Sequence, residues 1–96
     1  AAGECDKGIV ICTTGIGVSI CANKVKGIRC ALCDNPVSAK LTRLHNDANM
    51  LALGAGMTGE ILAMNIVDIF LDTPFSEEER HKRRIGKLEN EETTGC

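Results

Sequence analysis

The stretch GIVICTTGIG, residues 8–17, runs from a short apolar segment straight into a turn that contains two glycines. Its first five residues are apolar without a break and rich in β-branched side chains, which is typical of a strand buried in a parallel sheet. The next residues, VSICANKVK, can begin a helix directly after the glycines. The stretch therefore predicts a strand over residues 8–12, a turn and a helix.

Two more units of this kind follow along the chain. Apolar runs alternate with segments of helical spacing, which predicts strands at residues 27–33 and 49–53 and helices at residues 38–48, 59–71 and 76–88. Strands that alternate with helices imply parallel βαβ units. We therefore predict an α/β fold with an open, three-layer parallel sheet of the Rossmann or flavodoxin kind.

The longest predicted helix, residues 59–71, is expected to cover one face of this sheet. Thr73-Pro74 should end it, because the residue before a proline is driven out of helical geometry. Its inner side should carry five apolar side chains, namely Ile61, Leu62, Ile66, Ile69 and Phe70.

The first predicted strand has a requirement that three strands alone do not meet. A strand that is apolar throughout should be covered on both faces and paired along both edges. A parallel sheet of three strands leaves one such edge bare, which favours association with further chain. We therefore expect these residues to be only the later strands of the sheet, with their helices.

The composition is globular and argues against several classes of function. The 96 residues are 44% hydrophobic and 25% charged, as expected of one domain or part of one. We assign residues 1–88 to the carboxy-terminal part of a single domain and residues 89–96 to a disordered tail. The formal charge of −2 gives no general attraction to nucleic acid or to anionic membranes.

The cysteines and the amino terminus together predict a compartment. The terminal residues AAGECDKG lack a basic segment followed by an apolar one, so no signal peptide is expected. Without secretion, the six cysteines are best interpreted as reduced thiols. The sequence therefore predicts a cytoplasmic protein.

Cys12 stands where a ligand is expected. In open α/β sheets ligands bind at the carboxyl ends of the strands, and the amides of a turn at a helix start favour an anion. Gly15 and Gly17 let the backbone approach a ligand closely. Positive potential there can lower a thiol pKa from about 8.5 to roughly 3.5–7.5. This arrangement suits removal of a proton next to a carbonyl, although a structural cysteine before an ordinary strand–helix turn would give the same pattern.

Three blocks of the sequence resemble a known family in its own order and spacing. IVICTTGIGVSICANKVKGIRCAL resembles the ICGTGIGxSIAANKxxGIRAA segment of sugar-phosphate isomerases of the ribose-5-phosphate isomerase B type. LTRLHNDANMLALGA resembles their LSRxHNDANxLALGA segment, and TPFSEEERHKRR resembles their closing GRHxxR segment. The blocks cover nearly all of residues 5–88. The related galactose-6-phosphate isomerase subunits share the fold but keep the cysteine loop and the HND block less completely.

The resemblance implies a role for each matching residue of the first two blocks. Cys12 corresponds to the base that moves a proton between C2 and C1 of the sugar, and Thr14 would orient the substrate oxygens or relay a proton. His45 would open the furanose ring by acid–base transfer, since imidazole titrates near neutrality. Asn46 would bind a sugar hydroxyl. The remaining substrate contacts would come from the loop, namely Thr13, Gly15, Ile16 and Gly17.

The third block implies a phosphate site and an oligomer. Arg80 and Arg84 lie one helical turn apart, share a face and would grip the phosphate. In the family these arginines reach into the site of a neighbouring subunit, so a homodimer or a dimer of dimers is implied. The expected reaction is the interconversion of ribose 5-phosphate and ribulose 5-phosphate through an enediolate, without a metal or an organic cofactor.

The chain departs from the family pattern in ways that leave alternatives open. Thr13 stands where the family has glycine, and Gly56 stands where an arginine usually helps to bind phosphate. Val18 stands where members without the cysteine use a glutamate. The Asp-His pair and the tyrosine segment with which the family begins are absent from these residues. A truncated or diverged non-catalytic binding module, or an isomerase of allose or galactose 6-phosphate, therefore remains an alternative.

Two further patterns have simpler explanations than a site. Cys30 and Cys33 form a CxxC, but residues three apart in a strand face opposite sides, so a zinc site is not expected. The run RHKRR follows three glutamates and is typical of a solvated helix face, so nucleic-acid binding is not expected either. Asp47 is expected to close the end of its helix.

Overall fold

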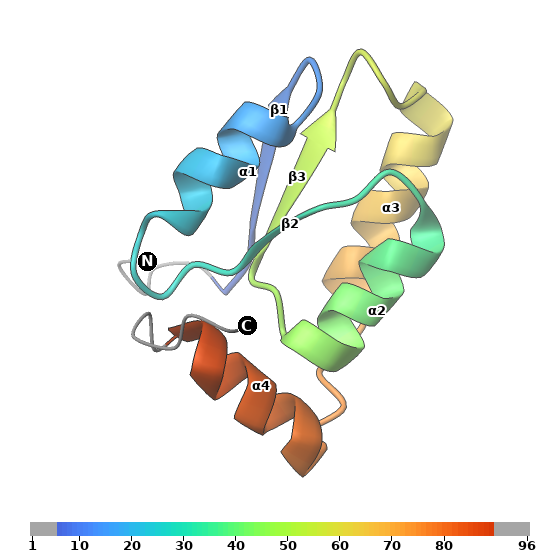
Figure 1. Cartoon of the computed structure of the whole chain (residues 1–96). Coiled ribbons are helices and arrows are strands. Elements are labelled where there is room, and N and C mark those ends of the chain that lie inside the picture. The colour runs from blue at the N-terminus through green and yellow to red at the C-terminus, as the bar shows by residue number, and fades with distance from the viewer. Residues whose placement is uncertain (1–5, 90–96) are drawn as a thin grey trace.

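Strands and helices alternate as predicted, and all strands are parallel. The computed structural model describes residues 6–89 of the chain. The sheet order is β1-β3-β2, so β3 is central (Figure 1). The elements are β1 (Gly8–Cys12), α1 (Ile16–Asn23), β2 (Cys30–Leu32), α2 (Pro36–Asn46), β3 (Met50–Gly54), α3 (Glu60–Asp72) and α4 (Glu79–Glu89).

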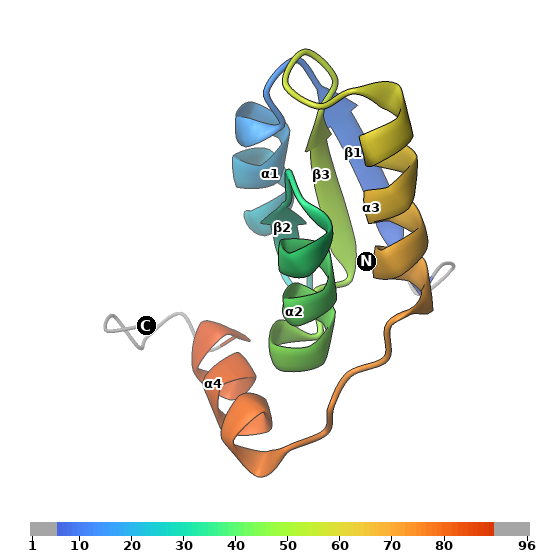
Figure 2. The same ribbon diagram turned by 90° about the vertical axis from the view of Figure 1, so that its right-hand side faces the viewer.

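Three layers are visible when the sheet is seen along its plane. Helix α1 covers one face, and α2 and α3 cover the other (Figure 2). Helix α4 packs against α2 beyond the amino ends of the strands. The predicted open, three-layer α/β architecture is therefore confirmed. Within the described residues, no helix is long and apolar enough to cross a membrane.

The second strand is shorter than predicted, because side chains and turns take over its first residues. Turn hydrogen bonds bind the chain just after α1, among them Ile28 N to Val25 O at 3.1 Å. The Arg29 amide then donates to the Asn49 side-chain oxygen at 2.9 Å instead of to a strand. Only Cys30–Leu32 therefore pairs with β3.

The ends of the helices are set by local chemistry. Asn35 caps α2 by accepting a hydrogen bond from the Ser38 amide at 2.8 Å, and Pro36 follows at the first helical position. Thr73 ends α3, as predicted, and its hydroxyl donates to Ile69 O at 2.7 Å. Helix α4 includes Glu89, which had been assigned to the tail, and the rest of that tail lies outside the described residues.

The face of α3 that packs on the sheet is narrower than predicted. Ile66 and Phe70 are fully buried and Ile69 is partly buried, but Ile61 is 85% exposed and Leu62 39% exposed. The prediction was wrong for Ile61, because a step of five along a helix turns a side chain about 140° away from Ile66. Leu62 is four residues from Ile66 and lies at the margin of the buried face, just inside the exposed range. The helix therefore leaves apolar side chains on the outside.

Strand β1 lies at the edge of the sheet. Its unbroken apolar pattern had instead indicated a strand that is paired along both edges. Ile9 and Ile11 pair in register with Leu51 and Leu53 of β3, which belong to the buried core. Yet Ile9 is 37% exposed and Ile11 60% exposed. Within residues 6–89, no strand pairs with the outer edge of β1. This apolar edge is thus open to further polypeptide.

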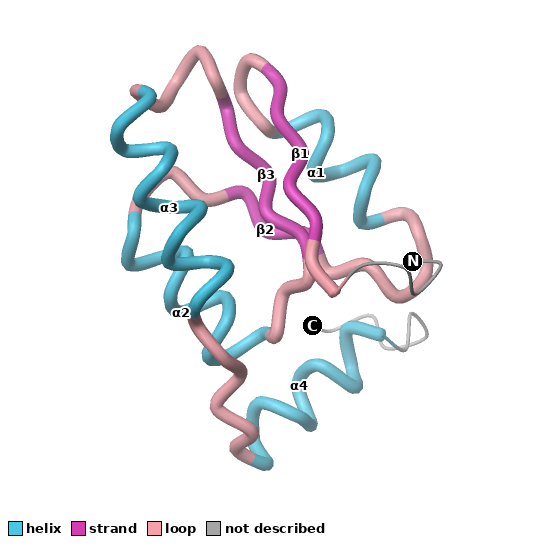
Figure 3. The backbone as a smooth tube through the Cα atoms, turned by 180° about the vertical axis from the view of Figure 1, so that it is seen from behind, coloured by secondary structure: helices cyan, strands magenta, loops and turns pink. Residues whose placement is uncertain are grey.

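The two ends of the sheet are distinct surfaces. We call the side where the strands end the carboxyl edge; it carries the loops of residues 13–15 and 55–59 (Figure 3). The opposite side is the amino edge, where α2 ends and α4 packs. Strands of five residues separate these edges by about 13 Å.

Candidate active site

Cys12 is the last residue of β1, and its thiol lies against the loop that follows. The Gly15 amide donates a hydrogen bond to the Cys12 sulfur at 3.2 Å. Gly15 has φ +80°, and a Cβ there would lie 2.5 Å from the Leu32 side chain and 3.0 Å from the Leu53 backbone. Only glycine fits this conformation and space. The glycine that the sequence singled out is therefore what aims an amide at the sulfur.

The loop after β3, residues 55–59, holds the loop after β1 in place. We call the latter, residues 13–15, the thiol loop. The Ala55 amide donates to Cys12 O at 2.7 Å, and the Gly56 amide donates to Thr13 O at 2.8 Å. A Cβ on Gly54 would lie 2.5 Å from Thr14 O, so the two backbones touch directly. The thiol loop is thus clamped by main chain on one side and by the start of α1 on the other.

This environment favours the thiolate. The Gly15 amide is the main cause that holds the pKa of the Cys12 thiol below its ordinary value. The amides of Thr14 and Val18 and the Thr14 hydroxyl lower the pKa further, while partial burial works against them. The thiol at the end of β1 therefore loses its proton more readily than an ordinary cysteine.

The other loop residues predicted to bind substrate lie around the same sulfur. The Thr14 hydroxyl accepts a hydrogen bond from the Ile16 amide at 3.2 Å, and both side chains are exposed. Gly17 belongs to the first turn of α1, whose amides have no carbonyl partners within the helix. Thr13 is exposed beside them. The structure therefore brings the predicted loop residues together.

His45 and Asn46 lie at the amino edge, away from Cys12. They are the last two residues of α2, which runs back from the carboxyl edge and ends four residues before β3 begins. The His45 ring stacks on the His81 ring of α4, with centroids 4.3 Å apart. His81 is 3% exposed, and its Nδ1 lies 2.8 Å from the Ser76 hydroxyl oxygen. Burial, and then the neighbouring His45, lower the pKa of His81.

The end of α2 is held by an arginine that the sequence analysis did not single out. Arg43 is 6% exposed and donates to Asp47 Oδ1 at 2.7 Å, to Ala48 O at 2.8 Å and to Thr73 O at 2.9 Å. Asp47 closes α2 in the left-handed conformation, as predicted, with φ 46°. The spacing of Arg43 and Asp47 by four residues is the sequence signal that could have indicated the pair.

Arg29 completes this support from the other side. Its guanidinium donates to Asn46 O at 3.1 Å and to Asp47 O at 2.9 Å, and it pairs with the Glu89 carboxylate of α4. His45 and Asn46 are therefore carried by a rigid network of cations and backbone carbonyls.

The predicted phosphate-binding arginines lie on α4. Arg80 and Arg84 are both exposed, and Arg80 makes one ion pair, with Glu78 at 3.4 Å. Because α4 packs at the amino edge, these side chains share the end of the molecule that holds His45. Within one chain, the predicted site residues thus fall into two groups at opposite edges.

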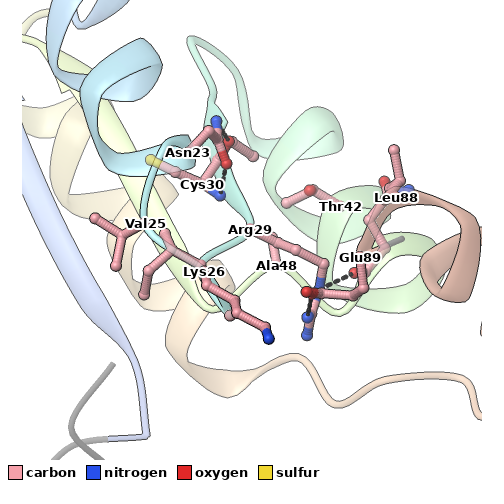
Figure 4. A pocket seen from close by; sticks show the side chains of 13 residues that line it. Asn23, Val25, Lys26, Arg29, Cys30, Thr42, Ala48, Leu88 and Glu89 are labelled. Atoms are coloured by element: carbon pink, nitrogen blue, oxygen red, sulfur yellow. Dashed lines mark hydrogen bonds and ion pairs between the residues drawn. The ribbon is translucent and has the colours of Figure 1, made fainter. Parts of the chain in front are cut away.

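Cavities occur at both edges. A cavity of ≈ 190 Å³ at the carboxyl edge is lined in part by Thr14, Ile16 and Asp34. A larger one of ≈ 430 Å³ lies at the amino edge, between the end of α1, the start of β2 and α4 (Figure 4). The one arginine that lines it, Arg29, is already paired with Glu89. Lys26 also lines the larger cavity, and Thr14, two residues after Cys12, lines the smaller one.

The CxxC pair has the character of packed thiols. Cys33 is 2% exposed, and burial is the main cause that raises its pKa to about 11. Burial also raises the pKa of Cys30. Among residues 6–89, no group of three or more His, Cys, Asp or Glu side chains could hold a metal ion.

The structure defines an α/β protein with a parallel sheet and, at the end of one strand, a thiol that accepts a hydrogen bond from the turn that follows. Comparison with known proteins gives the family. Residues 1–88 match the family described as Ribose/Galactose Isomerase, and the chain belongs to this family. The Escherichia coli protein named Ribose-5-phosphate isomerase B is 51% identical over 85 residues, which are 88% of this chain.

Solved structures agree in fold. The type B ribose 5-phosphate isomerase of Trypanosoma brucei superposes with a TM-score of 0.93 at 48% identity, over 95% of this chain. Ribose-5-Phosphate Isomerase B of Clostridium thermocellum superposes with a TM-score of 0.91 at 52% identity, over 99% of this chain. The chain spans 56% of the Escherichia coli protein and 61% and 64% of the two solved chains.

Proposed function

We propose that the chain carries the thiol half of a sugar-phosphate isomerase site that interconverts an aldose and a ketose phosphate, with Cys12 as the base. The observation that carries this proposal is the Gly15 amide on the Cys12 sulfur, 3.2 Å away, in a loop whose amides lower the thiol pKa. A thiolate beside backbone donors can take a proton next to a carbonyl and stabilise the oxyanion that forms.

The reaction moves two protons, one from C2 to C1 by way of the thiol and one from O2 to O1, and it needs no external reagent. The Cys12 thiolate takes the proton from C2 of the open-chain aldose, and the C–H electron pair forms the C1–C2 double bond while charge moves to O1. The thiol then returns the proton to C1, and the proton on O2 moves to O1, which leaves the ketone at C2. Loop amides would stabilise the enediolate by about 3–4 kcal/mol for each good donor. The Thr14 hydroxyl would relay the proton between the oxygens.

The second half of the site comes from another copy of the chain in this proposal. His45 would open the sugar ring, Asn46 would bind a hydroxyl, and Arg80 and Arg84 would hold the phosphate. These residues lie about 13 Å or more from Cys12 in the same chain, which is too far for one small sugar phosphate to contact all of them directly. A dimer whose two-fold axis runs across the strands can bring the carboxyl edge of each copy to the amino edge of its partner. The exposed apolar side chains of α3, among them Ile61 and Met64, offer surface for association.

Ribose 5-phosphate and ribulose 5-phosphate are the proposed substrates, in keeping with the names of the Escherichia coli, Trypanosoma brucei and Clostridium thermocellum relatives. Galactose 6-phosphate is the closest other candidate, since a Clostridium acetobutylicum relative named Galactose-6-phosphate isomerase subunit LacB is 44% identical over 75 residues. Allose 6-phosphate should be assayed beside both.

Turnover should be measured on this chain and on a chimera that adds the segment of the Escherichia coli protein that the chain does not span. We expect the chimera to be active and the chain alone to be inactive. Cys12→Ala in the chimera should abolish turnover with the fold retained, whereas Cys21→Ala, which removes an exposed thiol of α1, should not. Wild-type turnover by Cys12→Ala would show that the base is assigned wrongly.

Thiol reactivity tests the activation of Cys12 without turnover. At neutral pH, iodoacetamide should alkylate Cys12 faster than Cys21, because the thiolate is the reactive form and loop amides favour it at Cys12. Peptide mapping after short exposures measures both rates in one sample. Equal rates would remove the physical basis for the base.

Subunit mixing tests the two-copy site. Cys12→Ala and His45→Ala chimeras should each be inactive on the ring-closed aldose. When the two are produced together, random pairing gives mixed dimers in half of the cases, each with one intact site of two. We therefore expect about a quarter of wild-type activity to return. No recovery from dimers that demonstrably mix would exclude a site shared between copies.

A further inference from the structure

Thr13 and Gly56 are in contact at the rim of the carboxyl edge. A Cβ built on Gly56 would lie 2.9 Å from the Thr13 Cγ2 methyl and 3.1 Å from Thr13 O. Gly56 is not in the left-handed region of φ, so its backbone itself would accept a side chain. The obstacle to a side chain at position 56 is therefore Thr13.

The main chain cannot easily relieve this contact. The Gly56 amide donates to Thr13 O at 2.8 Å, and the adjacent Ala55 amide donates to Cys12 O at 2.7 Å. A shift of the loop after β3 away from the methyl would lengthen both hydrogen bonds. The Ala55 amide bonds the carbonyl of Cys12 itself. The contact between Thr13 and position 56 is therefore coupled to the position of Cys12.

The pair also determines the charge of the rim. The cavity at the carboxyl edge has one charged lining residue, Asp34, and no lysine or arginine among the described residues that line it. A long cationic side chain at position 56 would overlap the Thr13 methyl at its Cβ, and Gly56 itself brings no charge to the thiol. In the proposed dimer, a phosphate would meet Arg80 and Arg84 of the second copy.

We propose that Thr13 and Gly56 act as one specificity-determining pair, which keeps the thiol loop free of a cation from its own chain and leaves phosphate binding to the arginines of α4. The inference rests on the proposed function for its catalytic meaning. The contact couples the side-chain volume at position 13 to the volume that position 56 can accept.

Thermal unfolding of the chain tests the steric coupling without any turnover. Gly56→Arg should lower the unfolding temperature by about 5 °C or more, because the new Cβ overlaps the Thr13 methyl. Thr13→Gly together with Gly56→Arg should recover most of this loss. Gly59→Arg is the matched control, since a Cβ there meets nothing within 4 Å, and its effect should be the same with Thr13 or with glycine at position 13. If Gly56→Arg is no worse than Gly59→Arg, the coupling is overturned.

Phosphate binding tests the role in specificity. We expect the Thr13→Gly, Gly56→Arg double variant to bind inorganic phosphate about tenfold more tightly than the parent in calorimetric titrations, in the chain or in the chimera. In the active chimera, KM for ribose 5-phosphate should fall by a similar factor with a smaller change in kcat. Unchanged phosphate affinity in a folded double variant would overturn the proposal. If the double variant binds phosphate more tightly but the chimera shows no turnover, the result counts against the proposed function and not against this inference.

Discussion

The carboxyl and amino edges of the sheet are held together by different physics. At the carboxyl edge, glycine backbones touch one another, and amides from the start of α1 and the loop after β3 meet the thiol and the Cys12 carbonyl. At the amino edge, Arg29 and Arg43 pair with the carboxylates of Asp47 and Glu89, and the His45 ring stacks on the His81 ring. The first edge should therefore be sensitive to added atoms and the second to lost charge and to pH.

The largest effect should come from adding one carbon at the carboxyl edge. Gly15→Ala places a Cβ 2.5 Å from Leu32 and forces alanine into φ +80°, so unfolding free energy should fall by about 3 kcal/mol or more. Chemical denaturation measures this loss. Gly17→Ala is the matched control, since its Cβ meets nothing within 4 Å, and it should be neutral or slightly stabilising. Equal effects of the two alanines would show that the loop is not constrained.

The carboxyl edge was largely predictable from sequence because its features are local. An apolar β-branched run, two glycines and a helix start lie within residues 8–17, so the loop around Cys12 followed from adjacent residues. The order β1-β3-β2 was not predictable from the same residues, because it depends on how crossover helices pack across the whole sheet.

The amino edge was predicted only where the resemblance to the family reached. His45 and Asn46 were named from the HND block, but their placement about 13 Å from Cys12 depends on the direction of α2 after β2. The burial of Arg43 and His81 could not be inferred, because charged runs on helices are ordinarily solvated. Here six carbonyl and carboxylate oxygens accept hydrogen bonds from Arg29 and Arg43, and four of the six lie 17 or more residues from the arginine along the chain.

Loss of the buried cation should give the second largest effect, now at the amino edge. Arg43→Met keeps much of the volume but leaves Ala48 O and Thr73 O without their donor, so we expect about 2–3 kcal/mol less unfolding free energy. Arg83→Met, on the exposed side of α4, should change it by less than about 0.5 kcal/mol. A loss in Arg43→Met no larger than in the control would show that this network does not support the edge.

A pH effect should separate the two edges further. The pKa of His81 is lowered in the folded chain, so folding favours its neutral form. The resulting stabilisation is complete above the unfolded pKa of about 6.5 and is lost as pH falls below it. Besides His45, the charged groups that shift the pKa of His81 are Glu78, which raises it, and Arg80 and Arg84, which lower it.

His81→Asn isolates this contribution, because the amide oxygen can replace Nδ1 as the partner of the Ser76 hydroxyl. Between pH 7.5 and pH 5.5, the wild-type chain should lose more unfolding free energy than the variant. Denaturation series at both pH values measure the difference. The same pH change applied to Gly15→Ala should show the wild-type slope, because that substitution acts at the other edge. Parallel slopes for the wild type and His81→Asn would mean that His81 is not the group that titrates.

The smallest expected effect concerns the ion pair that ties α4 to the rest of the amino edge. The side chains of Arg29 and Glu89 are 21% and 35% exposed, so water and salt still reach the pair and weaken its attraction. Glu89→Gln should therefore lower unfolding free energy by about 0.5 kcal/mol at low salt, and by less at 1 M salt, where screening is strong. Glu79→Gln, which removes an exposed carboxylate in the first turn of the same helix, controls for the loss of one charge.

At the carboxyl edge we expect the opposite dependence on salt. The loss of unfolding free energy caused by Gly15→Ala should be unchanged by salt, because overlap of atoms is not screened. If salt reduces both losses equally, the two edges do not differ in the way their contacts imply.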